Sequence, residues 1–546
     1  MSCYQPETVT SIIDDSNKFI SITCNALGVL IEFKDSLRIF PMSLNDLCEM
    51  FGVEGKLTSY NPNFNNLEIF NNQNLLQEFI SYSLQDAKSL FKALFNAQNM
   101  YFNKFKVDIE SVYSTATLSL KIYRSKFQEE PIYILPSNID NFIRNSYYGG
   151  GTDVYKAYGK NVYYYDVNSL YPNAMLNPMP YDLIKIHNNM DNIKLDNFFG
   201  FIEVEVLCPI DMVRPVLPFH FKGKTIYPTG NWVGIYFSEE LKAMLQLGYK
   251  FRLIRGYEFS KANIFNKYVD HFFNIKSNAV GAKNLIAKLH LNGLYGYFGR
   301  RQDLIETVNV SNTSLHNYLA TRIVKEIMKI NNDYSTLLLS DNINHKVLRN
   351  LNMICESTIK GTNKIVMSNV AIAAAVTSYA RIHMIYYKLL PGTVYSDTDS
   401  IFTTDELPEL LIGSGLGLMK DELNGKFINE GLFLGIKKYG FWYFDENGNK
   451  IESSVFAGVK RNSLKFNEII DLYKGFKIHK TIDNRFYNSF NDLNISIKSA
   501  NISIQKSDRK VLVDNNYLPP HIINGKLVNP YNVGGNKFNY LKNKRL

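Results

Sequence analysis

Hydrophobic and polar positions alternate with two different periods along the chain, and both periods occur within the first 140 residues. Short apolar runs at Phe19–Thr23 and Val29–Phe33 are typical of strands, whereas Leu75–Asn96 has the three- and four-residue spacing of a helix. The spacings differ because strand side chains alternate between two faces, whereas a helix turns about every 3.6 residues. Residues 1–140 are therefore expected to form an α/β unit.

The rest of the chain continues this mixture. Its predicted elements are strands at Val162–Asp166 and Phe201–Leu207, helices within 261–298 and at 370–390, and a tight hairpin at Val394–Phe402. The segment 370–390 is apolar but contains Arg381, and no apolar stretch is long enough to cross a bilayer. We expect this segment to be a buried helix, and we expect no membrane partner.

Composition narrows the class of protein without deciding its function. The chain has 546 residues, of which 45% are hydrophobic and 20% charged, as in folded globular proteins. The net charge of +9 is mild, so any nucleic acid would have to be bound by local basic grooves. The 5 cysteines form no Cys-x-x-Cys pair, which argues against a disulfide scaffold and a cysteine zinc site.

The start of the chain and its codon preferences bear on location. The N-terminus lacks the pattern of a secretory signal or an Arg-rich transit peptide. The chain has 36 Tyr and 36 Phe but only 2 Trp, and it is crowded with Asn, Ile and Lys. Because most of these residues have A/T-rich codons, we expect a gene of an A/T-rich genome, such as that of an organelle or its plasmids.

Three aspartates follow strand-like segments. In VYYYDVNSLYP, Asp166 ends a β-rich run before a predicted turn into a helix, and in VYSDTDSIF, Asp397 and Asp399 lie two residues apart. Residues two apart on a strand share a face, and a turn between them would expose both. Three converging carboxylates would suit two Mg²⁺ ions about 3.5–4 Å apart. Each segment alone is more typical of solvated turn residues.

A segment between these aspartates combines basic, amide and aromatic side chains. In KSNAVGAKNLIAKLHLNGLYGYFGRR, the side chains of Lys288, Asn292 and Tyr295 would share one helical face. Such a face suits triphosphate charge, polar contact and base stacking, although an amphipathic helix with a solvated lysine is the alternative. The expected buried side is Leu285, Leu289 and Leu294, and the glycines at 293 and 296 suggest close approach of another backbone.

In this order, DVNSLYP, KLHLNGLYG and YSDTDS resemble the three polymerase motifs of family B DNA polymerases. YYGGG is similar to the YxGG motif of the protein-primed branch of this family, and KKYG at Lys437–Gly440 is similar to its KxY motif. VFAGVK at 455–460 resembles the entry to the thumb, and residues 200–259 occupy the position of the first terminal-protein-binding insertion. The resemblance is strong over about residues 140–465.

The resemblance implies roles for individual residues. Metal ligands would be Asp166, Asp397, Asp399 and the carbonyl of Val167, with the three aspartates catalytic. Nucleotide-binding residues would be Tyr171, Lys276, Lys288, Asn292 and Tyr295. Template and primer would contact Tyr147, Gly149, Gly150, Ser169, Gly293, Lys437 and Tyr439.

The chain departs from the family pattern in two places. Motif B usually has Asn-Ser, whereas Gly293 follows Asn292 here, and the missing hydroxyl is expected to weaken a template contact. At the N-terminus, Tyr82 and Asp86 have the spacing of the third exonuclease motif, but the two earlier motifs do not precede them. Asp108–Glu110 follows them, out of order, and is interpreted as a surface pair. We therefore expect a truncated exonuclease region without proofreading.

The expected fold class is α+β, a right-hand polymerase preceded by a partial α/β exonuclease-like domain. The expected domains are a truncated exonuclease-like region at 1–140, palm with the first insertion at 141–260, fingers at 261–300, a second insertion-like region at 301–366, palm with the hairpin at 367–450 and thumb at 451–546.

The expected function is DNA-directed DNA synthesis from a primer 3′ end, on a linear plasmid or phage-like genome. The cofactor would be two Mg²⁺ ions, for which Mn²⁺ could substitute, and the partners would be template-primer DNA, deoxynucleoside triphosphates and a terminal protein. A mitochondrial location is expected, with phage or host cytoplasm as the alternative. Two other hypotheses stay open. One is a decayed polymerase that only binds nucleic acid, and the other is a reverse transcriptase, although reverse transcriptases normally have adjacent aspartates in this hairpin.

Overall fold

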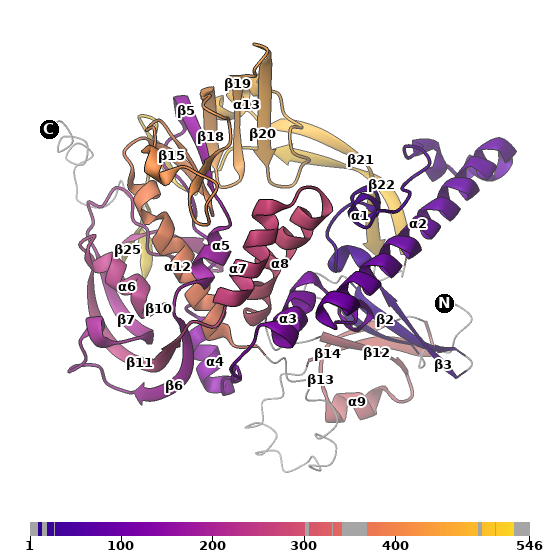
Figure 1. Cartoon of the computed structure of the whole chain (residues 1–546), viewed down its shortest axis with the longest axis horizontal. Helices are drawn as coiled ribbons and strands as arrows, with labels where there is room; N and C mark the ends of the chain where they lie inside the picture. Colours follow the sequence, from indigo (N-terminus) through magenta and orange to yellow (C-terminus); the bar gives the residue numbers. More distant parts are fainter. Residues whose placement is uncertain are drawn as a thin grey trace. The chain divides into compact units, whose positions relative to one another are not determined.

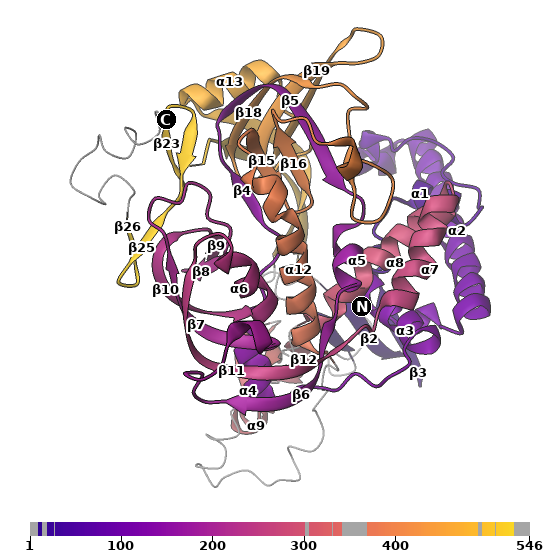
Figure 2. The same cartoon turned by 60° about the vertical axis from the view of Figure 1, so that its left-hand side comes forward.

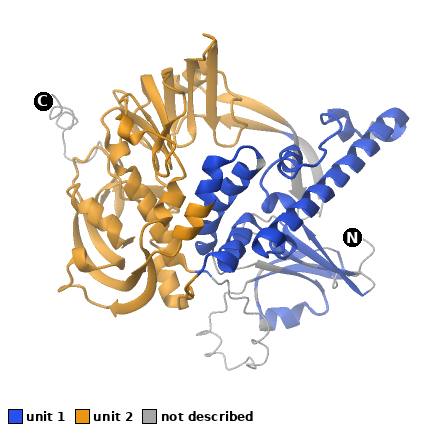
Figure 3. Cartoon of the chain, in the orientation of Figure 1, with its two compact units in different colours: residues 1–128, 272–368, 483–499 blue, residues 129–271, 369–482, 500–546 orange. Residues whose placement is uncertain are grey.

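A computed structural model describes residues 9–13, 19–26, 28–300, 305–329, 331–340, 368–489, 494–507 and 509–528. The chain divides into two compact units, each built from segments far apart in the sequence (Figure 3). Unit 1 contains Met1–Gln128, Phe272–Ser368 and Asp483–Ser499. Unit 2 contains Glu129–His271, Asn369–Ile482 and Ala500–Leu546. One boundary falls inside helix α7 (Asn266–Asn278).

The larger sheet of unit 2 has eight strands. Several of them are labelled in Figure 1. Its order is β20-β19-β18-β5-β16-β15-β4, and β17 pairs with β5. The strands are β4 (Thr152–Val154), β5 (Tyr158–Val167), β15 (Thr393–Asp397), β16 (Ser400–Thr403), β17 (Met419–Asp421), β18 (Ile428–Gly435), β19 (Lys438–Phe444) and β20 (Lys450–Phe456). The strand predicted at Val162–Asp166 and the hairpin predicted at Val394–Phe402 are confirmed.

A second sheet of unit 2 has six strands in the order β26-β25-β10-β7-β11-β6. These are β6 (Met179–His187), β7 (Gly200–Cys208), β10 (Thr229–Phe237), β11 (Lys250–Ala262), β25 (His521–Ile523) and β26 (Lys526–Val528). The hairpin β8 (Phe219–Phe221) and β9 (Lys224–Ile226) and the helices α4 (Ser137–Arg144) and α6 (Ser238–Leu245) accompany it. Its inner residues, including Ile202, Val204 and Trp232, form a buried apolar cluster.

Helix α12 (Val370–Leu389) runs between these two sheets (Figure 2). It contacts β15 on one side and β6 and β10 on the other, and residues 370–376 are all buried. The predicted buried helix at 370–390 is therefore confirmed. Arg381 of α12 is paired inside unit 2 with Glu240 of α6, with 2.7 Å between Nε and Oε1, so its charge does not lie unpaired in the core.

Unit 1 contains a six-stranded sheet that joins two distant parts of the sequence. Its order is β13-β14-β12-β1-β2-β3, and β1 pairs with β12 so that Thr10 lies opposite Val308. The strands are β1 (Val9–Ile13), β2 (Phe19–Ala26), β3 (Val29–Lys34), β12 (Ile305–Ser311), β13 (Ile323–Lys329) and β14 (Tyr334–Ser340). Segments that the sequence assigned to an N-terminal region and to a second insertion thus share one sheet.

Unit 1 also contains helices. They are α1 (Leu44–Met50), α2 (Gln73–Phe105), α3 (Thr115–Lys126), α8 (Ala282–Phe298) and α9 (Leu315–Thr321). Helix α2 extends well beyond the predicted Leu75–Asn96, and helices predicted within 261–298 are confirmed as α7 and α8.

The C-terminal part of the chain adds α13 (Phe466–Lys474), β21 (Ile478–Ser489), β22 (Asn494–Ile504), β23 (Val511–Val513) and β24 (Asn516–Leu518). The basic tail after residue 528 and all of residues 341–366 lie outside the described residues. Within the described part, no helix is long and apolar enough to span a membrane. Cys24, Cys48 and Cys208 are free and buried.

Candidate active site

Strand register brings Asp166 and Asp397 into one row of the larger sheet of unit 2. Asp397 of β15 lies opposite Ser400 of β16, and Ser400 lies opposite Asp166 of β5. On its other side Asp397 lies opposite Thr152 of β4. Directly opposed residues project to the same face, so both carboxylates share a face with one strand between them, roughly 10 Å apart at Cα. We call Thr152, Asp397, Ser400 and Asp166 the aspartate row.

Asp399 has a different position from Asp397. It lies with Thr398 in the two-residue turn between β15 and β16, so the two aspartates do not share a strand face. The backbone carbonyl of Asp399 accepts a 2.8 Å hydrogen bond from the N–H of Val167, which ties the turn to the end of β5. Burial raises the pKa of the Asp399 carboxyl, and the charge of Asp397 adds to the rise.

The carboxylate of Asp397 is held by hydroxyl groups. Thr152 Oγ1 donates to Asp397 Oδ1 over 2.8 Å, and the Tyr395 hydroxyl donates to Oδ2 over 3.4 Å. The same Tyr395 oxygen accepts the backbone N–H of Lys437 at 3.1 Å, and the rings of Tyr395 and Tyr439 lie 5.0 Å apart. The KxY-like segment therefore contacts the residue that orients Asp397. Sequence analysis missed Tyr395, although its position two residues before Asp397 on a strand was a usable signal.

The glycine loop, Gly149–Gly151, packs against this hairpin. The carbonyl of Gly151 accepts the backbone N–H of Thr398 at 3.1 Å and the ammonium of Lys388 at 2.9 Å. A Cβ on Gly151 would lie 2.1 Å from Lys388 Nζ, and one on Gly150 would lie 2.5 Å from Thr398 Cγ2. A Cβ on Gly149 would meet nothing within 4 Å. The two close-packed glycines are thus 150 and 151. The template contacts expected at Gly149 and Gly150 stay a prediction.

The two tyrosines before this loop also differ in how closely they are packed. Tyr148 is buried, and its carbonyl accepts a 2.7 Å hydrogen bond from Arg381, whereas Tyr147 is half-buried. YYGGG contains the YxGG pattern in two registers, beginning at Tyr147 or at Tyr148. The packing distinguishes them, because Tyr148, Gly150 and Gly151 are the members fixed by the protein core.

Tyr171 lies beside the glycine loop and the aspartate hairpin. It follows Ser169, which begins helix α5 (Leu170–Met175) with a left-handed φ of 61°. The Tyr171 hydroxyl is 2.7 Å from the Cβ that an alanine at 150 would carry. The structure therefore brings both Tyr171 and the turn containing Thr398 close to Gly150.

Positive φ angles at non-glycine residues occur in three of the motif segments. They are 61° at Ser169, 57° at Thr398 and 54° at Lys437. Each costs roughly 1 kcal/mol or more for an L residue, and a β-branched threonine is especially unsuited to this region. Hydrogen bonds hold Thr398 and Lys437 in place, since their N–H groups bond to Gly151 and Tyr395.

The donor set of the aspartate row fits Mg²⁺ completed by a substrate. Among the residues that the structure describes, no group of three or more His, Cys, Asp or Glu side chains forms a ready-made metal site. Mg²⁺ is usually bound by one or two carboxylates together with water and substrate phosphates, rather than by a protein cage. Asp166 and Asp397 on one face meet this requirement, whereas a structural zinc site would need more protein ligands.

The predicted nucleotide-binding helix lies in unit 1 as α8. Lys288 and Asn292 are exposed and Tyr295 is half-buried, as expected for one helical face. The predicted buried side is wrong in part: Leu294 is buried, but Leu285 is 43% exposed and Leu289 half-buried. The core side is instead formed by Ala287, His290, Leu291 and Leu294, because the buried stripe is rotated from the three predicted leucines. Lys276 of α7 is half-buried.

The two glycines of α8 have different surroundings. A Cβ on Gly293 would lie 2.7 Å from Ser119 Oγ of α3, so the Ser119 side chain or α3 would have to shift to accommodate it. A Cβ on Gly296 would meet nothing within 4 Å. A larger residue than glycine at position 293 would therefore crowd the side chains of α3. The expected close approach of another backbone is not seen at either glycine, because the atoms nearest a Cβ on Gly293 belong to the side chains of Ser119 and Thr115.

The exonuclease-like residues of unit 1 form a small cluster on α2. Lys56 Nζ donates to the Tyr82 hydroxyl over 3.0 Å and lies 4.0 Å from Asp86 Oδ2. Asp108 and Glu110 are exposed, in agreement with a surface pair. Lys56 was missed by sequence analysis, and the distance of 26 residues from Tyr82 offered no local signal.

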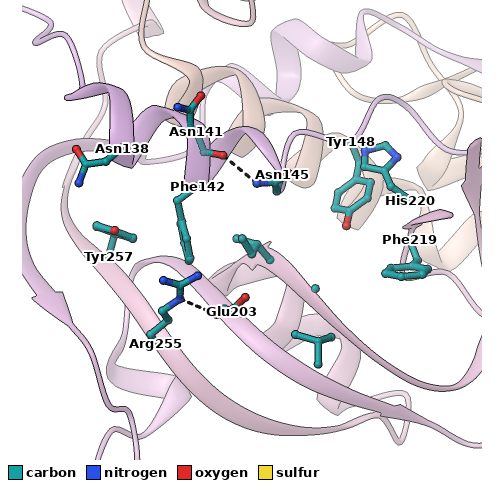
Figure 4. Close-up of a pocket in the computed structure, with 13 residues that line it drawn as sticks. Asn138, Asn141, Phe142, Asn145, Tyr148, Glu203, Phe219, His220, Arg255 and Tyr257 are labelled. Atoms are coloured by element: carbon teal, nitrogen blue, oxygen red, sulfur yellow. Dashed lines mark hydrogen bonds and ion pairs between the residues drawn. The ribbon is translucent and has the colours of Figure 1, made fainter. Parts of the chain in front are cut away.

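A pocket of about 690 Å³ lies in unit 2 between α4 and the second sheet (Figure 4). Its lining includes Asn138, Asn141 and Asn145 of the α4 segment, and it contains an ion pair of 2.6 Å between Arg255 and Glu203. It reaches Tyr148 but none of the aspartate row. This pocket is therefore separate from the aspartate row.

Comparison with known proteins identifies the family. Residues 54–388 match the family described as DNA polymerase type B, organellar and viral, which is more than half of the chain. The chain belongs to this polymerase family. A probable DNA polymerase of Podospora anserina is 30% identical over 540 residues, covering 89% of this chain and 45% of the relative.

Other DNA polymerases are similar to this chain as well. A probable DNA polymerase of Agaricus bitorquis is 26% identical over 547 residues, covering 90% of this chain and 68% of the relative. A DNA polymerase of Bacillus phage Nf is 28% identical over 206 residues, which is 34% of this chain and 35% of the phage protein. The chain spans about half the length of the relatives from Podospora, Neurospora and Ascobolus.

The fold agrees with that of a DNA polymerase of known structure. Phi29 DNA polymerase complexed with primer-template DNA superposes with a TM-score of 0.68 at 17% identity, covering 92% of this chain and 86% of the phage chain. The predicted fold class is thereby confirmed: a mixed α+β right-hand polymerase with an exonuclease-like region. The predicted domain boundaries stay a prediction.

Proposed function

We propose that this chain is a DNA-directed DNA polymerase that adds deoxynucleotides to a primer 3′ end. The observation that carries the proposal is the aspartate row, in which Asp166 and Asp397 share one face of the larger sheet of unit 2. Family membership and the likeness to phi29 polymerase support the same activity. Template-primer DNA and deoxynucleoside triphosphates would be its partners.

In the proposed reaction, the primer 3′-oxygen attacks the α-phosphorus of the nucleotide. The new phosphorus–oxygen bond forms as the bond to pyrophosphate breaks, pyrophosphate leaves, and the 3′-hydroxyl proton passes to solvent. Two bound Mg²⁺ ions would supply charge stabilisation for the attacking and leaving oxygens. Asp166, Asp397 and the Val167 carbonyl would hold them, with Asp399 at the turn.

The chain's own groups would orient these reactants. Thr152 and Tyr395 fix both carboxylate oxygens of Asp397, which removes the need to order this side chain during the reaction. Tyr171 would lie under the sugar, and Lys276, Lys288, Asn292 and Tyr295 would bind the nucleotide. Tyr147, Gly149, Gly150, Ser169 and Gly293 would position the template, and Lys437 and Tyr439 the primer end.

The biological setting is part of the same proposal. The fungal and phage relatives support a plasmid or phage origin, and with the A/T-rich composition they favour a linear mitochondrial plasmid replicated from a terminal protein.

Primer extension by the purified chain tests the proposal. We expect Mg²⁺-dependent extension on a DNA template, and at least about a thousandfold loss in Asp397→Ala and Asp166→Ala, since each removes several kcal/mol of charge stabilisation. Both variants should still bind DNA. Asp445→Asn is the control, because Asp445 caps the β19–β20 turn of the same sheet and lies outside the aspartate row.

Each alternative gives a different result. A decayed polymerase would bind template-primer without extending it, and a reverse transcriptase would extend on RNA at least as well as on DNA. Parental rates in Asp397→Ala would refute the assignment of the aspartate row.

A further inference from the structure

His290 lies on α8 between two proposed nucleotide-binding residues, Lys288 and Asn292, but its side chain points into unit 1. It is fully buried, as are Tyr101 of α2 and Ser119 of α3. His290 Nε2 is 2.8 Å from the Tyr101 hydroxyl, and Nδ1 is 3.0 Å from Ser119 Oγ. One imidazole therefore connects α8 to two helices of the N-terminal region.

Each ring nitrogen of His290 has one of these hydroxyls as a hydrogen-bond partner. Burial lowers the pKa of His290 to about 3, and the charge of Lys104 adds to the effect, so the ring is neutral. A neutral imidazole has one N–H donor and one acceptor nitrogen, whereas a hydroxyl can serve in either role. Either tautomer is thus accommodated, and removal of one hydroxyl leaves a buried nitrogen without its partner.

The contact restricts how α8 can lie. Two directional hydrogen bonds from one side chain to two helices oppose rotation of α8 about its axis. The ring also packs edge-on against Tyr101, at 5.5 Å between centroids, and against Phe272 at 5.0 Å. One turn further along, Ser119 Oγ occupies the space beside Gly293, so α3 contacts α8 on both sides of Asn292.

We propose that Tyr101 and Ser119 are positioning residues for nucleotide binding, acting through His290. They would set the rotation of α8 at which Lys288, Asn292 and Tyr295 meet the incoming nucleotide. This inference rests on the nucleotide-binding role in the proposed function. It gives the N-terminal region a task in the polymerase reaction that does not depend on exonuclease activity.

The test compares Tyr101→Phe and Ser119→Ala with the parental full-length chain. Each variant removes one hydroxyl and little volume. We expect the Kd for the correct deoxynucleoside triphosphate, measured on the chain bound to template-primer DNA, to rise about 5- to 20-fold. The KM for the same nucleotide should rise in parallel, while kcat and the Kd for DNA stay within about twofold.

Ser89→Ala is the matched control. Ser89 is also a buried hydroxyl on α2, and it bonds to the Glu54 carbonyl at 2.8 Å and to Gln85 at 3.1 Å, away from α8. Its loss should lower the thermal stability and leave the Kd for nucleotide unchanged.

A double variant separates positioning from stability. Tyr101→Phe combined with His290→Leu removes the unpaired polar nitrogen as well as the hydroxyl, so stability should recover relative to Tyr101→Phe. Positioning requires that the Kd for nucleotide stay high in this double variant. A Kd that follows thermal stability across all four variants, or that is unchanged in Tyr101→Phe and Ser119→Ala, would overturn the inference.

Failure of the proposed function gives a distinct result. If the parental chain bound nucleotide without extending primers, the polymerase chemistry would be refuted, and the Kd ratios would still decide the role of Tyr101 and Ser119. If the parental chain bound no nucleotide, the inference itself would fall.

Discussion

The ammonium of Lys388 donates a 2.9 Å hydrogen bond to the carbonyl of Gly151 deep inside unit 2. The same oxygen accepts the N–H of Thr398, the residue next to Asp397. A cation on α12 and the turn of the aspartate hairpin therefore meet at one atom of the glycine loop. Lys388 is 4% exposed, and the charges acting on it come from Asp153, Glu240, Arg381 and Asp397.

We predict that this lysine makes stability depend on alkaline pH. Burial lowers the pKa of Lys388 to about 8 from its ordinary value of 10.5. Between these values the unfolded chain binds more protons at this site than the folded chain, so the contribution of Lys388 to the free energy of unfolding rises with pH. Below about pH 8 the cost of burying the charge is present in full.

The measurement is denaturant unfolding of the parental chain and Lys388→Met from about pH 7 to about pH 10. The variant does not titrate at this site, so its free energy of unfolding relative to the parental value should fall as the pH rises. A pH-independent difference would contradict the prediction.

The three glycines of the loop should respond differently to alanine. Gly149→Ala should fold like the parental chain, because its Cβ would meet open space. Gly150→Ala would displace Thr398 or Tyr171, and Gly151→Ala would displace Lys388 from its carbonyl partner. We expect at least about tenfold slower extension from Gly150→Ala and Gly151→Ala, since misplacement of about 1 Å is costly at a reacting centre.

Thermal unfolding and steady-state extension together check this order. A loss in Gly149→Ala confined to DNA binding would support its proposed template contact, whereas equal behaviour of all three variants would count against the packing described here.

Tyr171 should determine sugar selection. Its ring follows Ser169 and lies at Gly150, where the proposed site would exclude a 2′-hydroxyl. Tyr171→Val should increase ribonucleotide incorporation relative to deoxynucleotides by about 10- to 100-fold, because the selection is steric. Tyr171→Phe keeps the ring and should remain selective. Competition between the two nucleotides in single-turnover extension measures the ratio, and equal ratios in all three proteins would refute this placement.

The 546-residue chain should not proofread. Two-metal excision needs several carboxylates, and the Lys56–Tyr82–Asp86 cluster contributes one. We expect no release of labelled mononucleotide from a mismatched primer when nucleotides are withheld. Release that is abolished by Asp86→Ala would show that other carboxylates complete the site.

The local pattern of hydrophobic and polar residues was sufficient to predict the strands and helices that contain the motifs. Alternation predicted the strand ending at Asp166 and the hairpin around Asp397, because period two is fixed by strand geometry. The sequence also indicated that Lys288, Asn292 and Tyr295 share a helical face. It could not show that Ser400 lies between the two aspartates, since pairing of β5 with β16 is a contact over more than 200 residues.

The features that were predicted wrongly or missed also depend on contacts between segments far apart in the sequence. Leu285 was expected in the core but is 43% exposed. The residues through which α8 contacts α2 and α3 include His290 and Gly293, so the buried face of α8 is centred on them and not on Leu285. The expected turn between Asp397 and Asp399 is present, whereas the left-handed φ of Thr398 within it was not predicted from the sequence. Tertiary contacts determine which side of a helix is buried and which backbone angles a turn adopts. They produce no periodic pattern of hydrophobic residues from which the sequence could predict them.

The pairing of β1 with β12 also imposes an order on biosynthesis. A ribosome that adds about 5–20 residues per second needs on the order of 15 to 60 seconds to pass from Thr10 to Val308. During that interval the edge of β1 that later receives β12 has no strand to pair with, and an unpaired edge invites association with other chains. The nascent N-terminal region must therefore remain incomplete, or be protected, until the motif B helix has already been translated.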